Sequence, residues 1–263
     1  MTGSGSEPVL GYPGCVRDGM LFAGFAENAG APSVLSVSPH AGVTVVIELG
    51  GNRVVGQRDR SGSHDSFIAG IRTESVKVQQ PAKVECLEVR MSPVAAWSLL
   101  PVSPKDLFGA IVTLDELWGA DGLRTLDRLH DMDSWTSRFR VVADLILRHA
   151  PRRAAIAPEI ATAWSIIRAR RGQVTVEALA TATGWSRQRL WRACNSQLGL
   201  SPKRLTMLTR FEHASELLMT GLPPSYVAAE CGYTDQSHLH RDVLAFAGRT
   251  PSELARSDPA APR

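Results

Sequence analysis

The sequence predicts an α+β protein in two parts, a β-rich N-terminal part with trailing helices and an all-helical C-terminal part. Short apolar runs separated by turn residues fill residues 20–90, and after Arg90 the apolar spacing becomes that of amphipathic helices. Pro151 then interrupts the pattern before a series of short helices. A length of 263 residues suits two domains of roughly 150 residues each. We therefore expect a tail at 1–14, domains at 15–150 and 155–256, and a second tail at 257–263.

Composition narrows the class of protein. With 44% hydrophobic and 21% charged residues the chain is globular rather than disordered or fibrous. Its apolar runs are too short to span a membrane, and its N-terminus lacks the pattern of a secretory signal, so we expect a cytoplasmic protein without a membrane partner. The four cysteines are scattered, which argues against a disulfide framework or a zinc site: Cys15, Cys86, Cys194 and Cys231.

The charge is unevenly distributed. Residues 152–263 contain 15 Lys and Arg against 9 Asp and Glu, a net charge of +6. Residues 1–151 contain 14 against 17, a net charge of −3. This distribution is expected if the C-terminal part meets nucleic acid and the N-terminal part does not.

The elements can be placed in order along the chain. Strands are expected at 43–49, 66–71, 76–79 and 84–89, which favours a small barrel or sandwich. Ser92-Pro93 and Ser103-Pro104 are typical helix starts, and amphipathic helices should follow at 121–130 and 134–149. The C-terminal part should contain helices at 159–171, 175–183, 186–198, 203–219, 224–230 and 235–247, with a last turn at Thr250-Pro251.

Two of these helix pairs repeat one layout, 48 residues apart when measured between Gly184 and Gly232. Each has a short helix with a central alanine, then glycine with an aromatic residue, a hydroxyl residue and a second helix bearing arginine: Ala180, Gly184, Trp185, Ser186 and Arg192, then Ala228, Gly232, Tyr233, Thr234 and Arg241. Small alanines let helices cross closely, glycine permits the turn, and the hydroxyl caps the second helix. The layout predicts two helix-turn-helix units joined by a long helix.

This duplicated pattern resembles the AraC/XylS family of bacterial transcription regulators over residues 156–256. Residues 228–241 are similar to the family signature A-x-x-x-G-F-x-[DS]-x-S-x-F-x-R, and residues 246–251 to the F/Y-G-x-[ST]-P that follows it. Residues 198–202 and 210–218 match the exit of the first unit and the connecting helix. The chain departs from the family at five expected core positions. The family usually has Phe where this chain has Cys194, Tyr233, Leu239 and Val243, and an aromatic residue where it has Leu205.

The resemblance implies binding to double-stranded DNA by two recognition helices in adjacent major grooves. Carried over by position, the expected DNA-binding residues are Arg187, Gln188, Trp191, Arg192 and Asn195 in the first helix, and Gln236, Ser237, His240 and Arg241 in the second. Arginine pairs with guanine, Gln and Asn pair with adenine, and an aromatic ring contacts the thymine methyl group. The alternative is that these residues are the solvated faces of ordinary amphipathic helices.

For the N-terminal part, the resemblance implies a cupin-like barrel that senses a small-molecule effector, with helices that pair two subunits, and RNA polymerase as a further partner. His40, Glu48 and His64 do not match the H-x-H-x(3,4)-E spacing of metal cupins, so neither a metal nor a cofactor is expected. Cys15 and Cys86 lack the basic neighbours of a redox sensor.

Two other functions compete with DNA binding. An enzyme on the β-rich part is disfavoured because the chain lacks G-x-S-x-G, Walker and H-E-x-x-H motifs. A protein-interaction adaptor would not need the basic faces of the two recognition helices. The expectation is therefore a non-enzymatic regulator.

Overall fold

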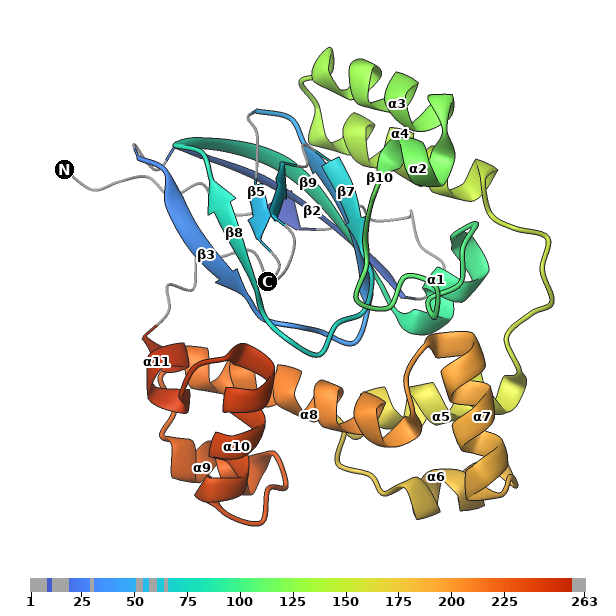
Figure 1. The fold of residues 1–263 in the computed structure, drawn as a ribbon, viewed down its shortest axis with the longest axis vertical. Helices are drawn as coiled ribbons and strands as arrows, with labels where there is room; N and C mark the ends of the chain where they lie inside the picture. The colour runs from blue at the N-terminus through green and yellow to red at the C-terminus, as the bar shows by residue number, and fades with distance from the viewer. Residues whose placement is uncertain are drawn as a thin grey trace.

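The structure, a computed structural model, describes residues 9–10, 19–28, 31–50, 54–56, 61–63 and 66–256. It contains a β-rich part followed by a helical part, which lies below the sheets in Figure 1. Within the expected N-terminal tail, Val9–Leu10 pair with the next strand, whereas the other tail residues and 257–263 lie outside the described residues. The α+β prediction is confirmed.

The described strands form two antiparallel sheets. The first has the order β1-β2-β9-β4-β7-β10 and the second β3-β8-β5-β6. Their bounds are β1 Val9–Leu10, β2 Met20–Asn28, β3 Ser33–Val37, β4 Val43–Glu48, β5 Val54–Gly56, β6 Ser61–Ser63, β7 Ser66–Ala69, β8 Val76–Gln80, β9 Lys83–Met91 and β10 Ile111–Thr113. All six residues of β4 are buried, as expected for a β-branched strand at the centre of a sheet.

The two sheets face each other. Val46 and Phe67 of the first sheet form a buried cluster with Val78 of the second. Val37, Val76 and Ile111 pack against the edge of this cluster. Of the barrel and the sandwich that the sequence left open, the described strands form the sandwich-like arrangement of two sheets.

Four helices belong to this part. One, α1 Pro93–Leu99, lies between β9 and β10, next to α7 in Figure 1. The other three follow β10 and lie together beside the first sheet (Figure 1): α2 Leu114–Trp118, α3 Ala120–His130 and α4 Trp135–Arg148. Ser92 caps α1, as predicted. The helix expected after Ser103-Pro104 is a series of turns instead, because the backbone of Gly109 and Ala110 bonds to Ile71 and Gly70 and continues into β10. The short α2 was not predicted, although Thr113 and Glu116 form a capping box there.

The helical part follows its predicted pattern closely. Its helices are α5 Pro158–Ala169, α6 Val176–Thr183, α7 Arg187–Leu198, α8 Pro202–Met219, α9 Pro224–Glu230, α10 Gln236–Ala247 and α11 Pro251–Ala255. The long helix α8 runs beneath the sheets, with α6 and α7 at one end and α9 and α10 at the other (Figure 1). Between α4 and α5, around Pro151, the chain is not helical.

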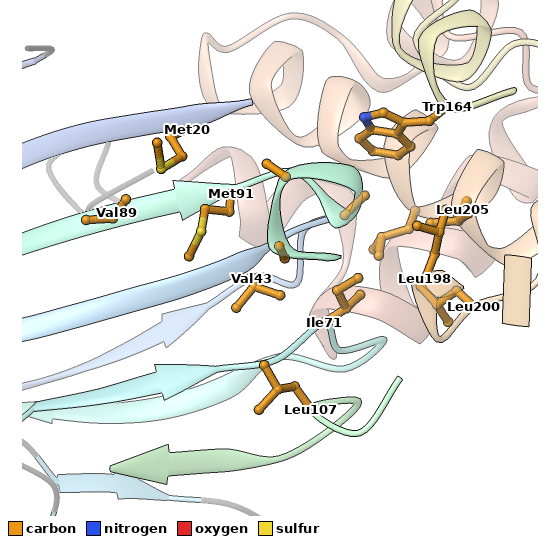
Figure 2. Packing of buried hydrophobic residues seen from close by; sticks show 14 of the residues in the cluster. Met20, Val43, Ile71, Val89, Met91, Leu107, Trp164, Leu198, Leu200 and Leu205 are labelled. Atoms are coloured by element: carbon orange, nitrogen blue, oxygen red, sulfur yellow. The ribbon is translucent and has the colours of Figure 1, made fainter. Parts of the chain in front are cut away.

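One buried apolar cluster extends through both parts. It includes Val43, Val89 and Met91 in the first sheet and Leu198 and Leu205 in the helical part. In Figure 2 the labelled side chains form a path from the strands through Ile71 toward Leu198 and Leu200. The helical part is therefore packed onto the β-rich part by apolar contacts, which the sequence pattern did not predict.

Across the described helices, none combines the length and the hydrophobicity needed to span a bilayer.

Candidate nucleic-acid interface

The first helix-turn-helix unit consists of α6, the turn at Gly184 and α7. Ala180 is buried where the two helices cross, and Gly184 has a left-handed backbone with φ of 68°. The Ser186 hydroxyl accepts a hydrogen bond from the Arg189 amide and caps α7. The alanine, glycine and serine thus have the structural roles that their spacing predicted.

The second unit consists of α9, the turn at Gly232 and α10. Ala228 is buried and Gly232 has φ of 67°, close to the value in the first unit. The predicted capping role of Thr234 is wrong, because the Asp235 carboxylate accepts the bond from the His238 amide at 2.7 Å. Asp is as good a helix cap as a hydroxyl residue, so the cap moves one position along the chain.

The residues expected to bind DNA lie on the outer faces of the two second helices. Eight are exposed: Arg187, Gln188, Trp191, Arg192, Gln236, Ser237, His240 and Arg241. Asn195 is half-buried and donates to the Trp191 carbonyl at 2.8 Å. Trp191 keeps 53% of its surface accessible, which is unusual for such a large apolar ring. Each recognition helix therefore presents a polar face, and the first adds an exposed aromatic ring.

Several of these side chains are held by neighbours. Arg187 pairs with Glu177 of α6 at 2.9 Å, and Arg241 donates to the Ser237 carbonyl at 3.3 Å. The pKa of Glu177 lies below its usual value because backbone amides and then Arg187 stabilise the carboxylate. Arg189, by contrast, stacks 4.3 Å over the Trp185 ring and so fills the corner of the turn.

A buried ion pair fixes the second recognition helix to α8. Arg210 of α8 bonds to Asp242 of α10 at 3.2 Å, and both side chains are largely buried. The same guanidinium lies 4.3 Å over the Tyr233 ring. Sequence reasoning placed Arg210 in the matched connecting helix but assigned it no role, because nothing in the local pattern indicates an interaction 32 residues away.

The loop between α5 and α6 joins the two units directly. Gln173 donates to the Glu230 carbonyl at the end of α9 at 2.9 Å, and Arg171 donates to His213 of α8 at 2.9 Å. Gly172 has φ of 76°, and a Cβ there would lie 2.3 Å from the Thr206 carbonyl oxygen. The relative position of the two recognition helices thus depends on this loop as well as on α8.

Both units also contact the β-rich part. Gly199, at the end of α7, packs so closely on Lys105 that a Cβ would lie 2.8 Å from the Lys105 Cα. Beyond α10, Arg249 donates to the Ser36 carbonyl of β3 at 3.2 Å, and Ser75 donates to the Ala247 carbonyl at 2.9 Å. These polar contacts add to the apolar cluster in holding the helical part against the sheets.

A cavity of about 210 Å³ lies between the sheets and α8. Its apolar wall comes from both sheets and includes Val46, Phe67 and Val78. Its α8 wall includes Glu212 and Ser215. Burial raises the pKa of Glu212 to about 7, although Arg168 and the Ala41 backbone oppose this shift. A molecule bound here would touch both the β-rich and the helical parts of the chain.

Of the N-terminal residues considered for metal or redox chemistry, Glu48 and Cys86 are cross-strand neighbours in β4 and β9, and His40 precedes β4. His40 bonds to Thr44 at 2.7 Å, and burial lowers its pKa to about 3, so the ring is neutral. Glu48 is buried, while His64 and Cys15 lie outside the described residues. Cys86 is a buried free thiol. In the described part of the chain, no three or more His, Cys, Asp or Glu side chains group as metal ligands.

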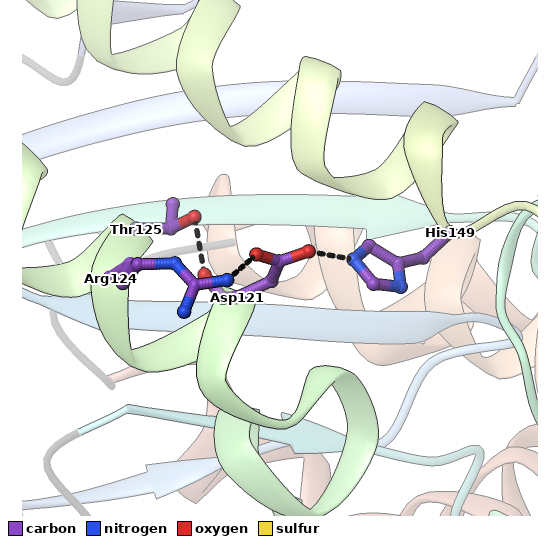
Figure 3. Close-up of polar contacts among 4 residues, drawn as sticks. All are labelled: Asp121, Arg124, Thr125 and His149. Atoms are coloured by element: carbon purple, nitrogen blue, oxygen red, sulfur yellow. Dashed lines mark hydrogen bonds and ion pairs between the residues drawn. The ribbon is translucent and has the colours of Figure 1, made fainter.

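The helices expected to pair two subunits form an antiparallel hairpin of α3 and α4. His149, the residue that follows α4, donates to the Asp121 carboxylate of α3 at 2.8 Å, and Arg124 pairs with the other carboxylate oxygen, as Figure 3 shows. These partners keep the pKa of Asp121 below its usual value. Near this pair, Leu123 and Leu147 expose 50% and 48% of their surfaces. The hairpin therefore carries exposed apolar side chains next to the polar contacts that Asp121 makes with His149 and Arg124.

Comparison with known proteins identifies the helical part. Residues 179–257 match a family model described as a helix-turn-helix domain. A curated relative from Bacillus subtilis (strain 168), the uncharacterized HTH-type transcriptional regulator YbfI, is 36% identical over 66 residues. This match covers 25% of the present chain and 24% of the relative, so the chain spans about a quarter of the relative's length. The helical part therefore contains a helix-turn-helix domain and is similar in sequence to a transcription regulator, in agreement with the predicted resemblance to the AraC/XylS family.

Solved structures extend the likeness to the whole fold of this chain. ToxT from Vibrio cholerae matches 90% of this chain and 98% of its own, with a TM-score of 0.53 and 9% identity. ToxT from strain SCE256 with an unsaturated fatty acid bound matches 91% of this chain and 95% of its own, with a TM-score of 0.54 and 8% identity. At these identities the likeness concerns the fold: a β-rich part followed by two helix-turn-helix units.

Proposed function

We propose that this chain is a sequence-specific DNA-binding transcription regulator whose two recognition helices, α7 and α10, read adjacent major grooves. The observation that carries the proposal is the pair of complete helix-turn-helix units at opposite ends of α8, each with an exposed polar second helix. A recognition helix enters the major groove, and one helical turn of DNA, about 34 Å, separates successive grooves.

Within this proposal the exposed residues divide into two roles. Gln188 and Gln236 lie in the first turn of their helices and read base edges. Arg192 and Arg241 bind phosphate or guanine, with Trp191 against a thymine methyl group. Arg187 exchanges its Glu177 partner for DNA, because an exposed ion pair of this kind holds its partners weakly. Asn195, Ser237 and His240 complete the two contact surfaces.

The β-rich part senses a small-molecule effector in this proposal. Two features support it: the cavity is bounded by both sheets and by α8, and the fold is similar to that of ToxT, which has been solved with an unsaturated fatty acid bound. A molecule in the cavity contacts the helix that joins the two DNA-reading units. Effector binding then changes the position of one unit relative to the other.

Two protein partners complete the proposal. A second copy of the chain pairs through the α3–α4 hairpin, where Leu123 and Leu147 are exposed. RNA polymerase is the partner through which a cytoplasmic regulator of this family acts, and the chain is not an enzyme.

A salt titration of duplex binding tests the central proposal. Binding of the full chain to a mixed-sequence duplex should weaken by orders of magnitude between about 50 and 200 mM salt, because each neutralised phosphate releases counterions. In the variant with both Arg192→Gln and Arg241→Gln, the plot of log affinity against log salt concentration should have a smaller slope, by the amount expected for about two lost phosphate contacts. Binding that is independent of salt, or a slope that the two substitutions leave unchanged, would contradict the proposed interface.

Dividing the chain gives a second test. Residues 155–256 should bind the duplex, whereas residues 1–150 should not bind it but should self-associate through the α3–α4 hairpin. Sedimentation of residues 1–150 as a monomer at high concentration would exclude pairing through this hairpin.

A further inference from the structure

The two recognition helices share one register when their residues are counted from the helix caps. Asp235, the cap of α10, comes 49 residues after Ser186, the cap of α7, and each helix has 12 residues. The turn glycines, by contrast, are 48 residues apart, so the second unit has one residue more between its turn and its cap. Counted from the caps, the buried positions of the two helices coincide: Leu190 with Leu239, Cys194 with Val243 and Leu198 with Ala247.

The outer faces of the two helices correspond in this register as well. In α7, four expected DNA-binding residues have the spacing i, i+3, i+4 and i+7: Gln188, Trp191, Arg192 and Asn195. The residues of α10 at the same positions are Ser237, His240, Arg241 and Leu244. Side chains at this spacing lie on one face of a helix, and homeodomains read the major groove with four residues spaced in this way. Leu244 is therefore the fourth member of the outer face of α10.

The sequence pattern alone did not indicate this role for Leu244. Counting from the turn glycines pairs Asn195 with Val243, and Val243 is fully buried. The observed cap at Asp235 shifts the pairing by one residue, to Leu244. The extra residue in the second turn thus decides which side chain of α10 joins the outer face.

Leu244 is a large apolar side chain that the rest of the chain leaves accessible. It exposes 48% of its surface, although Val243 and Phe246 beside it are buried. The bond from Ser75 to the Ala247 carbonyl ties the end of α10 to the β-rich part without covering Leu244. In α7 and α10, which the structure describes throughout, the exposed large apolar side chains are Trp191 and Leu244.

The surroundings of Leu244 favour DNA as its partner. His240 and Arg241 precede it on the same exposed face. The one acidic residue of α10, Asp242, is buried and bonded to Arg210, so it adds no negative charge to this face. An apolar side chain beside a cation suits a major groove, where phosphates flank the base edges and the C5-methyl group of thymine is an apolar contact point.

We propose that Leu244 is a specificity-determining residue that contacts the C5-methyl group of a thymine in the major groove read by α10. This inference rests on the proposed function and deepens it, because it assigns a base-specific contact to an apolar residue of the second recognition helix. Burial of one methyl group against the leucine should make binding about fourfold tighter than binding to the same site without that methyl group.

Removal of a single methyl group from the DNA tests the inference. The parent chain and Leu244→Ala each select preferred duplexes from a random pool, and the thymine that only the parent chain prefers is then replaced by deoxyuridine, which lacks the methyl group. The parent chain should bind the substituted duplex about fourfold more weakly, whereas Leu244→Ala should bind both duplexes equally. Leu21→Ala, at the leucine of β2 that is 50% exposed, is the matched control and should keep the fourfold difference.

Three results would overturn the inference while leaving the proposed function intact. They are identical selected sequences for the parent chain and Leu244→Ala, equal affinity of the parent chain for the two duplexes, and a fourfold difference that persists in Leu244→Ala. Identical selected sequences would indicate that the exposed leucine serves a protein contact instead. If the parent chain selects no preferred sequence at all, the proposed function fails and this inference fails with it.

Discussion

The two helix-turn-helix units share one layout but are held in different ways. In the first unit, the end of α7 and the residues after it, Leu198 to Leu200, make apolar contacts with the β-rich part. The recognition helix of this unit is rich in exposed arginine. The second is locked by the buried Arg210–Asp242 pair under the Tyr233 ring, and the residues after α10 bond to β3. The repeated pattern therefore specifies the local turn, while residues outside the pattern decide how each recognition helix is held.

Loss of a core leucine in each unit should have the largest effect and should show whether the units unfold separately. Leu190 and Leu239 are both fully buried. Leu190→Ala and Leu239→Ala should each lower the free energy of unfolding by about 2–5 kcal/mol, through lost burial and a residual cavity. Hydrogen exchange should report lost amide protection mainly in the substituted unit. Equal loss of protection in both units would mean that they form one cooperative body.

Removing the Arg210–Asp242 ion pair should lower the stability of the second unit alone. Arg210→Met leaves Asp242 buried without its partner and should cost about 2–4 kcal/mol in urea unfolding, somewhat below the cost for fully buried pairs. Combining Arg210→Met with Asp242→Leu removes both charges and should restore much of the lost stability. If the single variant is as stable as the parent chain, the ion pair does not distinguish the second unit from the first.

Reading of bases should divide between the two units. Gln188→Ala and Gln236→Ala should each relax preference at a few different base pairs, at about 1–3 kcal/mol per lost contact, without changing helical content by circular dichroism. The preferences are measured by selection from a random duplex pool. Inserting five base pairs between the two half-sites should abolish high-affinity binding, because it rotates one groove to the opposite face. Unchanged preferences together with a tolerated insertion would refute two-helix reading.

A smaller, pH-dependent effect should arise beside the second unit, at Glu212. The pKa of Glu212 is about 7 in the folded chain, against an ordinary value of 4.5. Between pH 4.5 and about 7 the folded chain therefore keeps a proton on this side chain that the unfolded chain has lost. Stability should therefore fall as pH rises from 4.5 to about 7, by about 1–2 kcal/mol, since the side chain is one quarter exposed. Arg168, Arg90 and Glu216 are the charged groups around it.

Glu212→Gln should flatten this profile in thermal unfolding. Glu230→Gln, at an exposed residue of α9, is the control and should leave the profile as it is. A profile that persists in Glu212→Gln would assign the pH dependence to another group.

The sequence predicts the helical part in detail because its signals are local. Gly184, Gly232 and Ser186 act within a few residues of their own positions, and their roles are confirmed. The error at Thr234 is also local, since Asp235 beside it is an equally good cap. Core positions such as Cys194 and Leu239 are buried as expected. The DNA contacts assigned to the exposed faces remain predictions.

Long-range features could not be predicted in this way. The pair of Arg210 and Asp242 and the bond from Gln173 to Glu230 depend on how helices pack, which hydrophobic spacing does not specify. The turns after Pro104 likewise replace a helix because their backbone pairs with Gly70 and Ile71. The cavity combines residues from both sheets and α8, so its chemistry becomes visible only in three dimensions.

The continuous apolar cluster limits how freely the parts of this chain can be exchanged. A hybrid regulator made by joining a foreign sensing domain at Pro151 would leave Trp164, Leu198 and Leu200 facing a surface that had not been shaped for them. Beyond the join, Arg153 and Ala154 bond to Leu100 and Trp97, so the linker itself is attached to α1 and the residue after it. The natural unit of exchange is therefore the helical part together with residues 93–107, and a useful hybrid would carry that segment across intact.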